Sequence, residues 1–323
     1  MRIVDAINVD DFNSQCLIPE EPAIIKGIAR DWAAMQKWDW DFFTNCYGTS
    51  VVPLSYYKTR GQERFTSQEK AALGSYLSKF RDPRDEQTGE EDPYVAGWNF
   101  IKDHPELADD FNRSPPCFPD NWLPKIPSSI SLPTHTLFFG HSGVSTPLHT
   151  DSFFVHTWLT MIVGSKTVRM VAPKDSNKVE NGMDLFNPDT ADAVLRGGAK
   201  IFEGTACEAD AIYIPPGWWH NVINGGTNIA VQSLYVDVLR FPVFEQQIRR
   251  LILPTLQRLS AVGKEARSAA LASSQVHVRT PAHGISDFQR REEEYLEFLA
   301  DARADTQAYL EELLRPDPWK HTK

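Results

Sequence analysis

Residues 153–171 read FFVHTWLTMIVGSKTVRMV, which is two apolar runs separated by Gly164-Ser165. The runs are rich in Val, Ile, Thr and aromatic residues, which favour strands, and a two-residue turn that contains glycine is typical of a hairpin. We therefore predict strands over residues 153–163 and 166–171, joined by a hairpin turn.

Further strands of the same kind are expected on both sides of this pair. They cover residues 134–139, 211–214 and 229–236, and glycines and prolines separate them. No helical pattern of 10–15 residues alternates with these strands, so a parallel α/β sheet is disfavoured. The pattern favours a mainly β fold, an antiparallel sandwich or barrel, with added helices.

The region before the barrel mixes short elements. Residues 22–27 predict a strand, residues 39–47 a helix capped by Asp39, and residues 67–80 a helix that begins at a capping box. Residues 102–133 are rich in proline and aromatic residues, which indicates irregular chain laid over a core rather than a free linker.

Beyond residue 241 the pattern becomes helical, because apolar residues recur at three- and four-residue steps. We therefore divide the chain into an N-terminal α/β region (1–133), a barrel (134–240) and a C-terminal helical region (241–323). The C-terminal helices must pack somewhere, either over the barrel or against a second chain, and we expect a homodimer through them.

Composition narrows the classes of function. The chain has 323 residues, 41% of them hydrophobic, so it can bury a sizeable core. Its net charge of −10 argues against a general grip on nucleic acid or on an anionic membrane. Apolar runs long enough for a membrane span and a signal peptide are both missing. Four scattered cysteines fit a reducing cytosol, so we expect a cytoplasmic protein, with a nuclear location left open.

The motif Thr146-Pro-Leu-His149-Thr-Asp151 places a histidine and an aspartate two residues apart. On a strand, both side chains would project from the same face. Far downstream, residues 214–220 (IPPGWWH) place His220 after a strand and a Pro-Gly turn. A closed barrel can bring the three together as the facial triad of non-haem Fe(II) oxygenases. An isolated His-x-Asp is more often a surface pair than a metal site. A chance occurrence of this pair together with the other motifs is much rarer.

Lys166 begins its strand and shares a face with Val168 and Met170, by the period of two. A lysine directed into a barrel is costly unless it meets an anion, and the distal carboxylate of 2-oxoglutarate would be such an anion. The position of Lys166 in the sequence equally allows an exposed lysine in a turn that never contacts a ligand. Thr146 could add a hydroxyl to the same carboxylate; otherwise it is an ordinary strand threonine.

The stretch from about Thr134 to Asp237 resembles the jumonji-C domain of the cupin superfamily, and within it the protein hydroxylases and their small bacterial and fungal relatives. The matching motifs are TPLHTD (146–151), VGSK (163–166), IYIPPGWWH (212–220), and NGG (224–226) followed by IAVQ (229–232). The region before the barrel is similar to the one that these enzymes place there.

This resemblance implies a double-stranded β-helix, the jelly-roll or cupin barrel. It also implies Fe(II), 2-oxoglutarate as the co-substrate that chelates it, and O2. The residues that it implies are His149, Asp151 and His220 on the metal, and Lys166, Thr146 and Tyr94 on the distal carboxylate.

One departure from the family concerns the strand between the aspartate and the lysine, where several relatives carry an asparagine. Residues 156–159 read HTWL here, so Thr157 or His156 would have to make that contact. Gln232 also stands where a relative has asparagine. The role of His156 stays open, since a histidine on a strand is more often a core residue.

The resemblance implies a dioxygenase that hydroxylates a C–H bond of a protein or peptide side chain, or of an amino acid, and converts 2-oxoglutarate to succinate. A small-metabolite hydroxylase and an N-methyl demethylase with the same chemistry are alternatives. A cupin that binds metal without turnover, and a zinc or manganese cupin, are rivals of another class. Zinc or manganese sites usually use more histidines and would give Lys166 no role.

Overall fold

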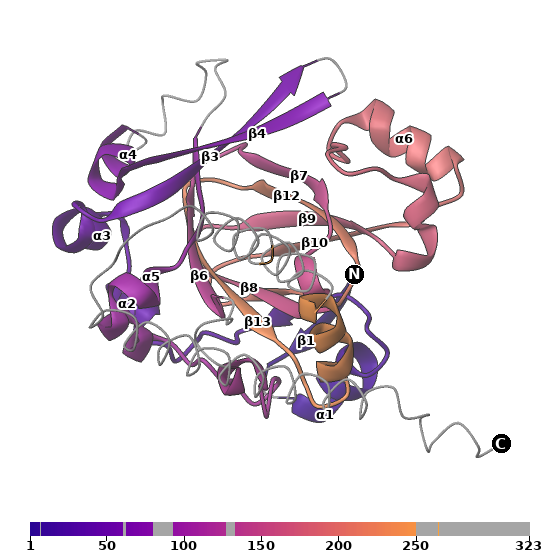
Figure 1. The fold of residues 1–323 in the computed structure, drawn as a ribbon, viewed down its shortest axis with the longest axis horizontal. Helices are drawn as coiled ribbons and strands as arrows, with labels where there is room; N and C mark the ends of the chain where they lie inside the picture. The colour runs from indigo at the N-terminus through magenta and orange to yellow at the C-terminus, as the bar shows by residue number, and fades with distance from the viewer. Residues whose placement is uncertain (7, 61–62, 80–92, 127–132, 250–263, 265–323) are drawn as a thin grey trace, which may run out of the picture. The chain divides into compact units, whose positions relative to one another are not determined.

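The computed structural model describes residues 1–6, 8–60, 63–79, 93–126, 133–249 and 264 (Figure 1). Residues Met1–Ile252 form one compact unit. The expected C-terminal helices, and the homodimer through them, lie almost wholly outside the described residues. Residues 241–249 are helical, as expected for the start of that region.

Two sheets make up the body of this unit. Their strands are β1 (Arg2–Asp5), β2 (Ala23–Lys26), β3 (Val51–Arg60), β4 (Glu63–Ala72), β5 (Tyr94–Trp98), β6 (His135–Gly140), β7 (Ser145–His149), β8 (His156–Val163), β9 (Lys166–Val171), β10 (Ile201–Ala206), β11 (Ala211–Ile214), β12 (Trp219–Asn224) and β13 (Asn228–Tyr235). The larger sheet has the order β1-β2-β11-β8-β13-β6-β5-β3-β4, and the smaller one β10-β9-β12-β7.

The two sheets face each other across an apolar interior (Figure 1). Strands of both contribute to one buried cluster, which includes Leu159, Met161, Val168, Met170, Ile212, Ile214, Val222 and Ala230. The pairs among β6 to β13 are antiparallel. This arrangement confirms the predicted jelly-roll, or double-stranded β-helix, and each strand presents alternate residues to the interior.

The N-terminal region extends the larger sheet instead of standing apart from it. β1 and β2 continue the sheet beyond β11, and β5, β3 and β4 continue it beyond β6. Short helices pack on the outer face: α1 (Val9–Phe12), α2 (Ala34–Lys37), α3 (Trp40–Tyr47), α4 (Leu73–Lys79) and α5 (Phe100–Asp103). As predicted, Asp39 caps α3 by accepting a hydrogen bond from the amide of Phe42 at 2.7 Å.

An aromatic core fills the space between these helices and the sheet. Phe118 stacks on Trp158 of β8 with ring centroids 4.1 Å apart, and Phe43 meets Phe139 of β6 edge-on at 4.8 Å. Phe111, Phe118 and Leu123 of the proline-rich stretch are buried, which confirms that this irregular chain covers a core. No described helix is long and apolar enough to cross a membrane.

The predicted helix over residues 67–80 is wrong in its first half. Residues up to Ala72 belong to β4, which pairs with β3 along its whole length, and only Leu73–Lys79 is helical. The apolar residues that suggested a helix, Leu73, Tyr76 and Leu77, are the ones that α4 buries. Ladder pairing with β3 therefore outweighed the local capping signal.

The predicted hairpin at Gly164-Ser165 is also wrong. β8 lies in the larger sheet and β9 in the smaller one, so this turn is a corner at which the chain changes sheets. The expected strand over 153–163 begins only at His156. The sequence patterns also did not reveal β3, β7, β10 and β12. The helix α6 (Pro188–Arg196) lies between β9 and β10.

The corner at Gly164 generates a testable prediction about stability. Gly164 has a φ of +75°, and a Cβ added there would lie 2.4 Å from the carbonyl oxygen of Thr227. Gly143 has a φ of +81°, but a Cβ there meets nothing within 4 Å. We expect Gly143→Ala to lower the free energy of unfolding by about 1 kcal/mol, and Gly164→Ala to lower it by about 2–4 kcal/mol because a clash adds to the backbone strain. Chemical denaturation checks this, and equal losses would contradict it.

Candidate metal centre

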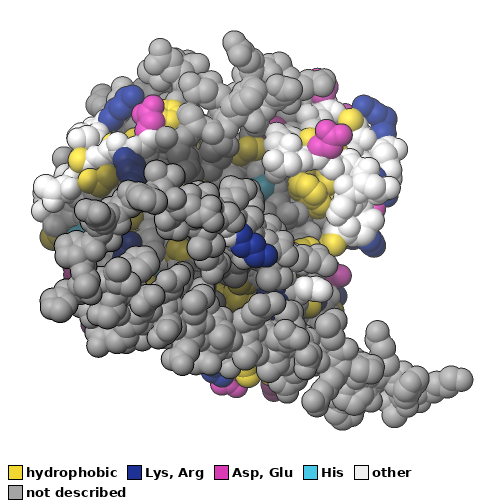
Figure 2. Space-filling model, viewed as in Figure 1, with side chains coloured by type: hydrophobic (Ala, Val, Ile, Leu, Met, Phe, Trp, Pro, Cys, Tyr) yellow, Lys and Arg dark blue, Asp and Glu magenta, His cyan; other side chains and the backbone are white. Residues whose placement is uncertain are grey.

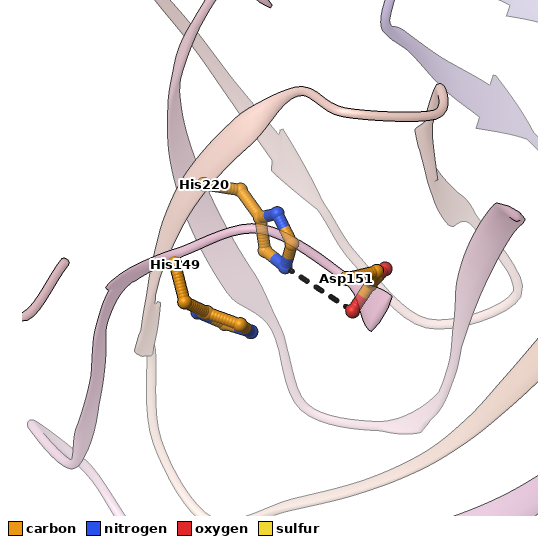
Figure 3. A group of neighbouring side chains, drawn as sticks. All are labelled: His149, Asp151 and His220. Carbon is orange, nitrogen blue, oxygen red and sulfur yellow. Dashed lines mark ion pairs between the residues drawn. The ribbon is translucent and has the colours of Figure 1, made fainter. Parts of the chain in front are cut away.

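Three side chains meet where β7 and β12 lie side by side (Figure 3). His149 ends β7 and pairs directly with His220 of β12, and their ring centroids are 4.1 Å apart. Asp151 follows two residues after the end of β7, and its Oδ1 lies 3.8 Å from Nε2 of His220. One ligand atom from each residue lies within 4.8 Å of the others. The structure therefore brings the predicted ligands together.

Backbone carbonyls orient both imidazoles. Nδ1 of His149 lies 2.8 Å from the carbonyl oxygen of Pro147, and Nδ1 of His220 lies 3.1 Å from that of Trp218. A carbonyl only accepts, so each Nδ1 carries the proton and each Nε2 keeps its lone pair. Burial, with a contribution from His149, lowers the pKa of His220 to about 4. The imidazole of His220 is therefore neutral at pH 7, as a metal ligand must be.

The carboxylate of Asp151 is held from the opposite sheet. The hydroxyl of Thr157, at the start of β8, donates to Oδ2 of Asp151 at 2.6 Å. The chain between them includes Phe153 and Phe154, whose φ angles are +68° and +54°. Non-glycine residues rarely adopt these values, so this turn is strained.

The donor set fits Fe(II). Two imidazole nitrogens and one carboxylate are the ligands of non-haem iron oxygenases, and three protein ligands leave coordination positions for other reactants. Among the described residues, the His, Cys, Asp or Glu side chains that lie close enough, as a group of three or more, to share an ion are those of His149, Asp151 and His220. A histidine side chain is visible at the bottom of a hollow on the face shown in Figure 2.

A β-bulge places Thr146 on the same face as His149. Between the pairs His149↔His220 and Thr146↔Val222, β7 advances by three residues and β12 by two. On a regular strand, residues three apart would face opposite sides. Because Val222 belongs to the interior cluster, the half-buried Thr146 opposite it faces the interior as well.

Lys166 lies on the same inner face and is 1% exposed. Its Nζ donates to the hydroxyl of Tyr94 at 2.8 Å and to Oδ1 of Asn224. No carboxylate of the described residues pairs with it, and burial lowers its pKa to about 7. The structure thus brings Tyr94, 72 residues away in the chain, onto the predicted lysine. A buried ammonium with only neutral neighbours is a site for an anion.

Asn224 is a residue that sequence reasoning did not assign to the site. Its Oδ1 accepts from Lys166, while its Nδ2 is buried without a hydrogen-bond partner in the described structure. A donor left unpartnered in this way is costly unless a ligand satisfies it. In the sequence, only its place in the NGG motif pointed to Asn224. Its contact with Lys166 depends on the register of β12 with β9, which the sequence does not show.

His156 lies away from the three ligands, whereas Gln232 is on the inward-facing side of β13, two residues from Ala230 and opposite Leu159. His156 packs between Tyr213 and Tyr235, on the face of β8 opposite to Thr157, and its Nδ1 lies 2.8 Å from the hydroxyl of Tyr213. It is therefore a core residue, and burial lowers its pKa to about 4. Gln232 accepts a hydrogen bond from Thr136 at 3.2 Å.

Comparison with known proteins agrees with this geometry. Residues 9–239, well over half of the chain, match the family described as the cupin-like domain. The chain belongs to the cupin-like domain family.

Relatives of this cupin-like domain carry the jumonji-C name, which confirms the predicted resemblance. The Jumonji C domain-containing protein 5 of Drosophila melanogaster is 23% identical over 239 residues, which cover 71% of this chain and 58% of the relative. Lysine-specific demethylase 8 of Xenopus tropicalis is 25% identical over 225 residues, covering 67% and 48%. The human 2-oxoglutarate and iron-dependent oxygenase JMJD4 is 22% identical over 256 residues, covering 72% and 60%. The chain thus spans about half the length of these relatives.

The metal centre of this cupin-like domain predicts the effect of removing a ligand. We expect His149→Ala, Asp151→Ala and His220→Ala each to weaken Co(II) binding about a hundredfold or more, because even the loss of an outer contact typically costs 10–100-fold. Anaerobic titration followed by Co(II) absorbance measures this. The control is His104→Gln, because His104 is a half-buried histidine that packs against Tyr47 and Trp98 and contacts none of the three ligands. Unchanged affinity in His149→Ala would refute the assignment.

Proposed function

We propose that the chain is an Fe(II)- and 2-oxoglutarate-dependent dioxygenase. It hydroxylates a C–H bond of a protein or peptide side chain, or of an amino acid, and converts 2-oxoglutarate to succinate. The observation that carries the proposal is that the inner face of the smaller sheet, with the loop after β7, holds both a metal-ligand triad and a buried lysine that pairs with no carboxylate of the described residues. The names of the relatives, which include an iron- and 2-oxoglutarate-dependent oxygenase, support it.

The cluster around Lys166 supports binding of the co-substrate. A dicarboxylate that reaches from the metal toward Lys166 would supply the missing negative charge. Asn224 and Thr146 add an amide and a hydroxyl on this face, and Tyr94 adds a phenol from β5 of the larger sheet. All three groups can donate to a carboxylate. Thr157 remains a predicted co-substrate contact, although its hydroxyl donates to Asp151 in this structure.

The protein's part in the reaction is to bind, orient and exclude water. Iron held by His149, Asp151 and His220 would supply the oxidising chemistry with 2-oxoglutarate and O2, which side-chain acids and bases cannot provide. Carbonyl acceptors hold both imidazoles in the tautomer that leaves Nε2 free. The apolar cluster between the sheets, with Met170 and Val222 beside His220, would limit the access of water from the interior side of the site.

Demethylation by the same chemistry is a second candidate. Relatives are named lysine-specific and arginine-specific demethylases, and hydroxylation of a methyl group on nitrogen ends in loss of that group. These names also favour a protein substrate over a free metabolite. A cupin that binds metal without turnover is less well supported, because it would leave Lys166 and its neighbours Tyr94 and Asn224 without a role. We expect a reducing compartment, cytoplasmic or nuclear, since all four cysteines are free.

Turnover without a prime substrate tests the activity. We expect the purified protein with Fe(II), ascorbate and O2 to form succinate from 2-oxoglutarate, slowly, and His149→Ala to stay at background because it lacks a ligand. Succinate is measured by chromatography. An absence of turnover together with no 2-oxoglutarate-dependent change in the metal-site spectrum would favour the non-catalytic cupin.

The lysine predicts how pH affects co-substrate binding. The pKa of Lys166 in the unliganded protein is about 7, whereas a bound carboxylate needs the charged form. Above pH 7, binding must therefore take up a proton, so affinity should fall by up to about tenfold per pH unit as pH rises. Calorimetry of 2-oxoglutarate binding to the Co(II)-loaded protein from pH 6.5 to 8.5 measures this. Lys166→Met should bind more weakly and without this slope; a flat profile in the wild type would contradict the prediction.

A further inference from the structure

We propose that Thr157 is a positioning residue for the metal centre: its hydroxyl fixes the carboxylate of Asp151 so that one oxygen remains directed at the ion. This inference rests on the proposed function, because it concerns the iron ligands. Nothing in the motif TPLHTD or in the family match assigns such a role to a threonine six residues after the aspartate.

The three ligands are not held equally well by the backbone. His149 and His220 lie on β7 and β12 and pair with each other across the ladder, so their backbones are fixed. Asp151 lies beyond the end of β7 and belongs to no strand. Its side chain therefore needs another constraint to keep a geometry suited to a metal ion.

Thr157 supplies this constraint from a rigid place. It lies on β8, which pairs with β11 on one side and with β13 on the other, opposite Ile214 and Leu234. Its side chain is fully buried, so water does not compete for the hydroxyl. The 2.6 Å hydrogen bond to Asp151 thus links the loop after β7 to the larger sheet.

The hydrogen bond from Thr157 gives the two oxygens of the Asp151 carboxylate different roles. Oδ2 accepts from Thr157, while Oδ1 is the oxygen that faces Nε2 of His220 at 3.8 Å. A carboxylate free to rotate could offer both oxygens to an ion and occupy a position that the co-substrate or O2 needs. The threonine therefore favours a single-oxygen ligand and open positions on the metal.

The strained turn between the two residues agrees with this role. Phe153 and Phe154 both have left-handed φ angles, and both lie in the segment between Asp151 and β8. Phe153 packs near Phe244 with ring centroids 6.2 Å apart, whereas the ring of Phe154 lies beside Gly217 and is 45% exposed. Strain of this kind persists where the surrounding structure holds it, and it concentrates at functional sites.

The strand β8 itself offers a matched control. Thr160 is also fully buried, but it lies on the opposite face of β8, and its hydroxyl has no hydrogen-bond partner in the described structure. Thr157→Val and Thr160→Val make the same isosteric change on one strand. Only the first removes the hydrogen bond to Asp151, and Thr157→Ser keeps it.

The test is metal affinity, measured by anaerobic Co(II) titration of the full chain and its variants, with melting of the metal-free proteins as a check on folding. We expect Thr157→Val to weaken Co(II) binding 10–100-fold, Thr157→Ser to stay within about threefold of the wild type, and Thr160→Val to be unchanged. Should Thr157→Val not fold, Thr157→Ala also lacks the hydroxyl and carries the same expectation.

Each other outcome overturns the inference in a recognisable way. Wild-type affinity in Thr157→Val shows that the hydroxyl does not act on the metal ligand. Equal losses in Thr157→Val and Thr160→Val point to a general effect on β8, and a failure of Thr157→Ser to restore binding excludes the hydrogen bond as the cause. A wild-type protein that binds no Co(II) refutes the proposed function itself, whereas the other results leave that function intact.

Discussion

The site depends above all on the pairing of β12, which lies between β9 and β7 in the smaller sheet. Its inner face carries His220, Val222 and Asn224 in succession. On one side, β7 sets His149 and Thr146 against the first two, and on the other side β9 sets Met170, Val168 and Lys166 against all three. One strand register thus fixes the distance between the metal ligands and the buried lysine. A shift by a single residue would turn His220 and Asn224 to the opposite face together.

The sequence predicted the residues of the site better than the elements that carry them. His149, Asp151 and His220 could be grouped because their chemistry is specific, and Lys166 because its place on an alternating strand directed it inward. Two of the strands that bring them together, β7 and β12, were not recognised. They are short, and β7 is interrupted by a proline and a bulge, so neither residue preference nor alternation reveals them.

Contacts between distant parts of the chain were beyond sequence reasoning. The hydrogen bond of Thr157 to Asp151 depends on how the two sheets pack, and that of Lys166 to Asn224 depends on the register of β9 with β12. No local pattern encodes either of them. The same holds for the turn at Gly164-Ser165. Two apolar strands around a short glycine turn usually pair with each other, but here closure of the barrel directs them into different sheets. The helix expected from residue 67 failed for a similar reason, because pairing with β3 decided the outcome.

The contact between Tyr94 and Lys166 has a consequence for how the chain could be shortened. Tyr94 lies on β5, which pairs with β6 of the barrel and belongs to the region before residue 134. A fragment that begins at residue 134 would lose a partner of the lysine and would expose the edge of β6 as an unpaired strand. The smallest piece that retains the contact between Tyr94 and Lys166 must therefore include β5, because the barrel alone lacks this partner of the lysine.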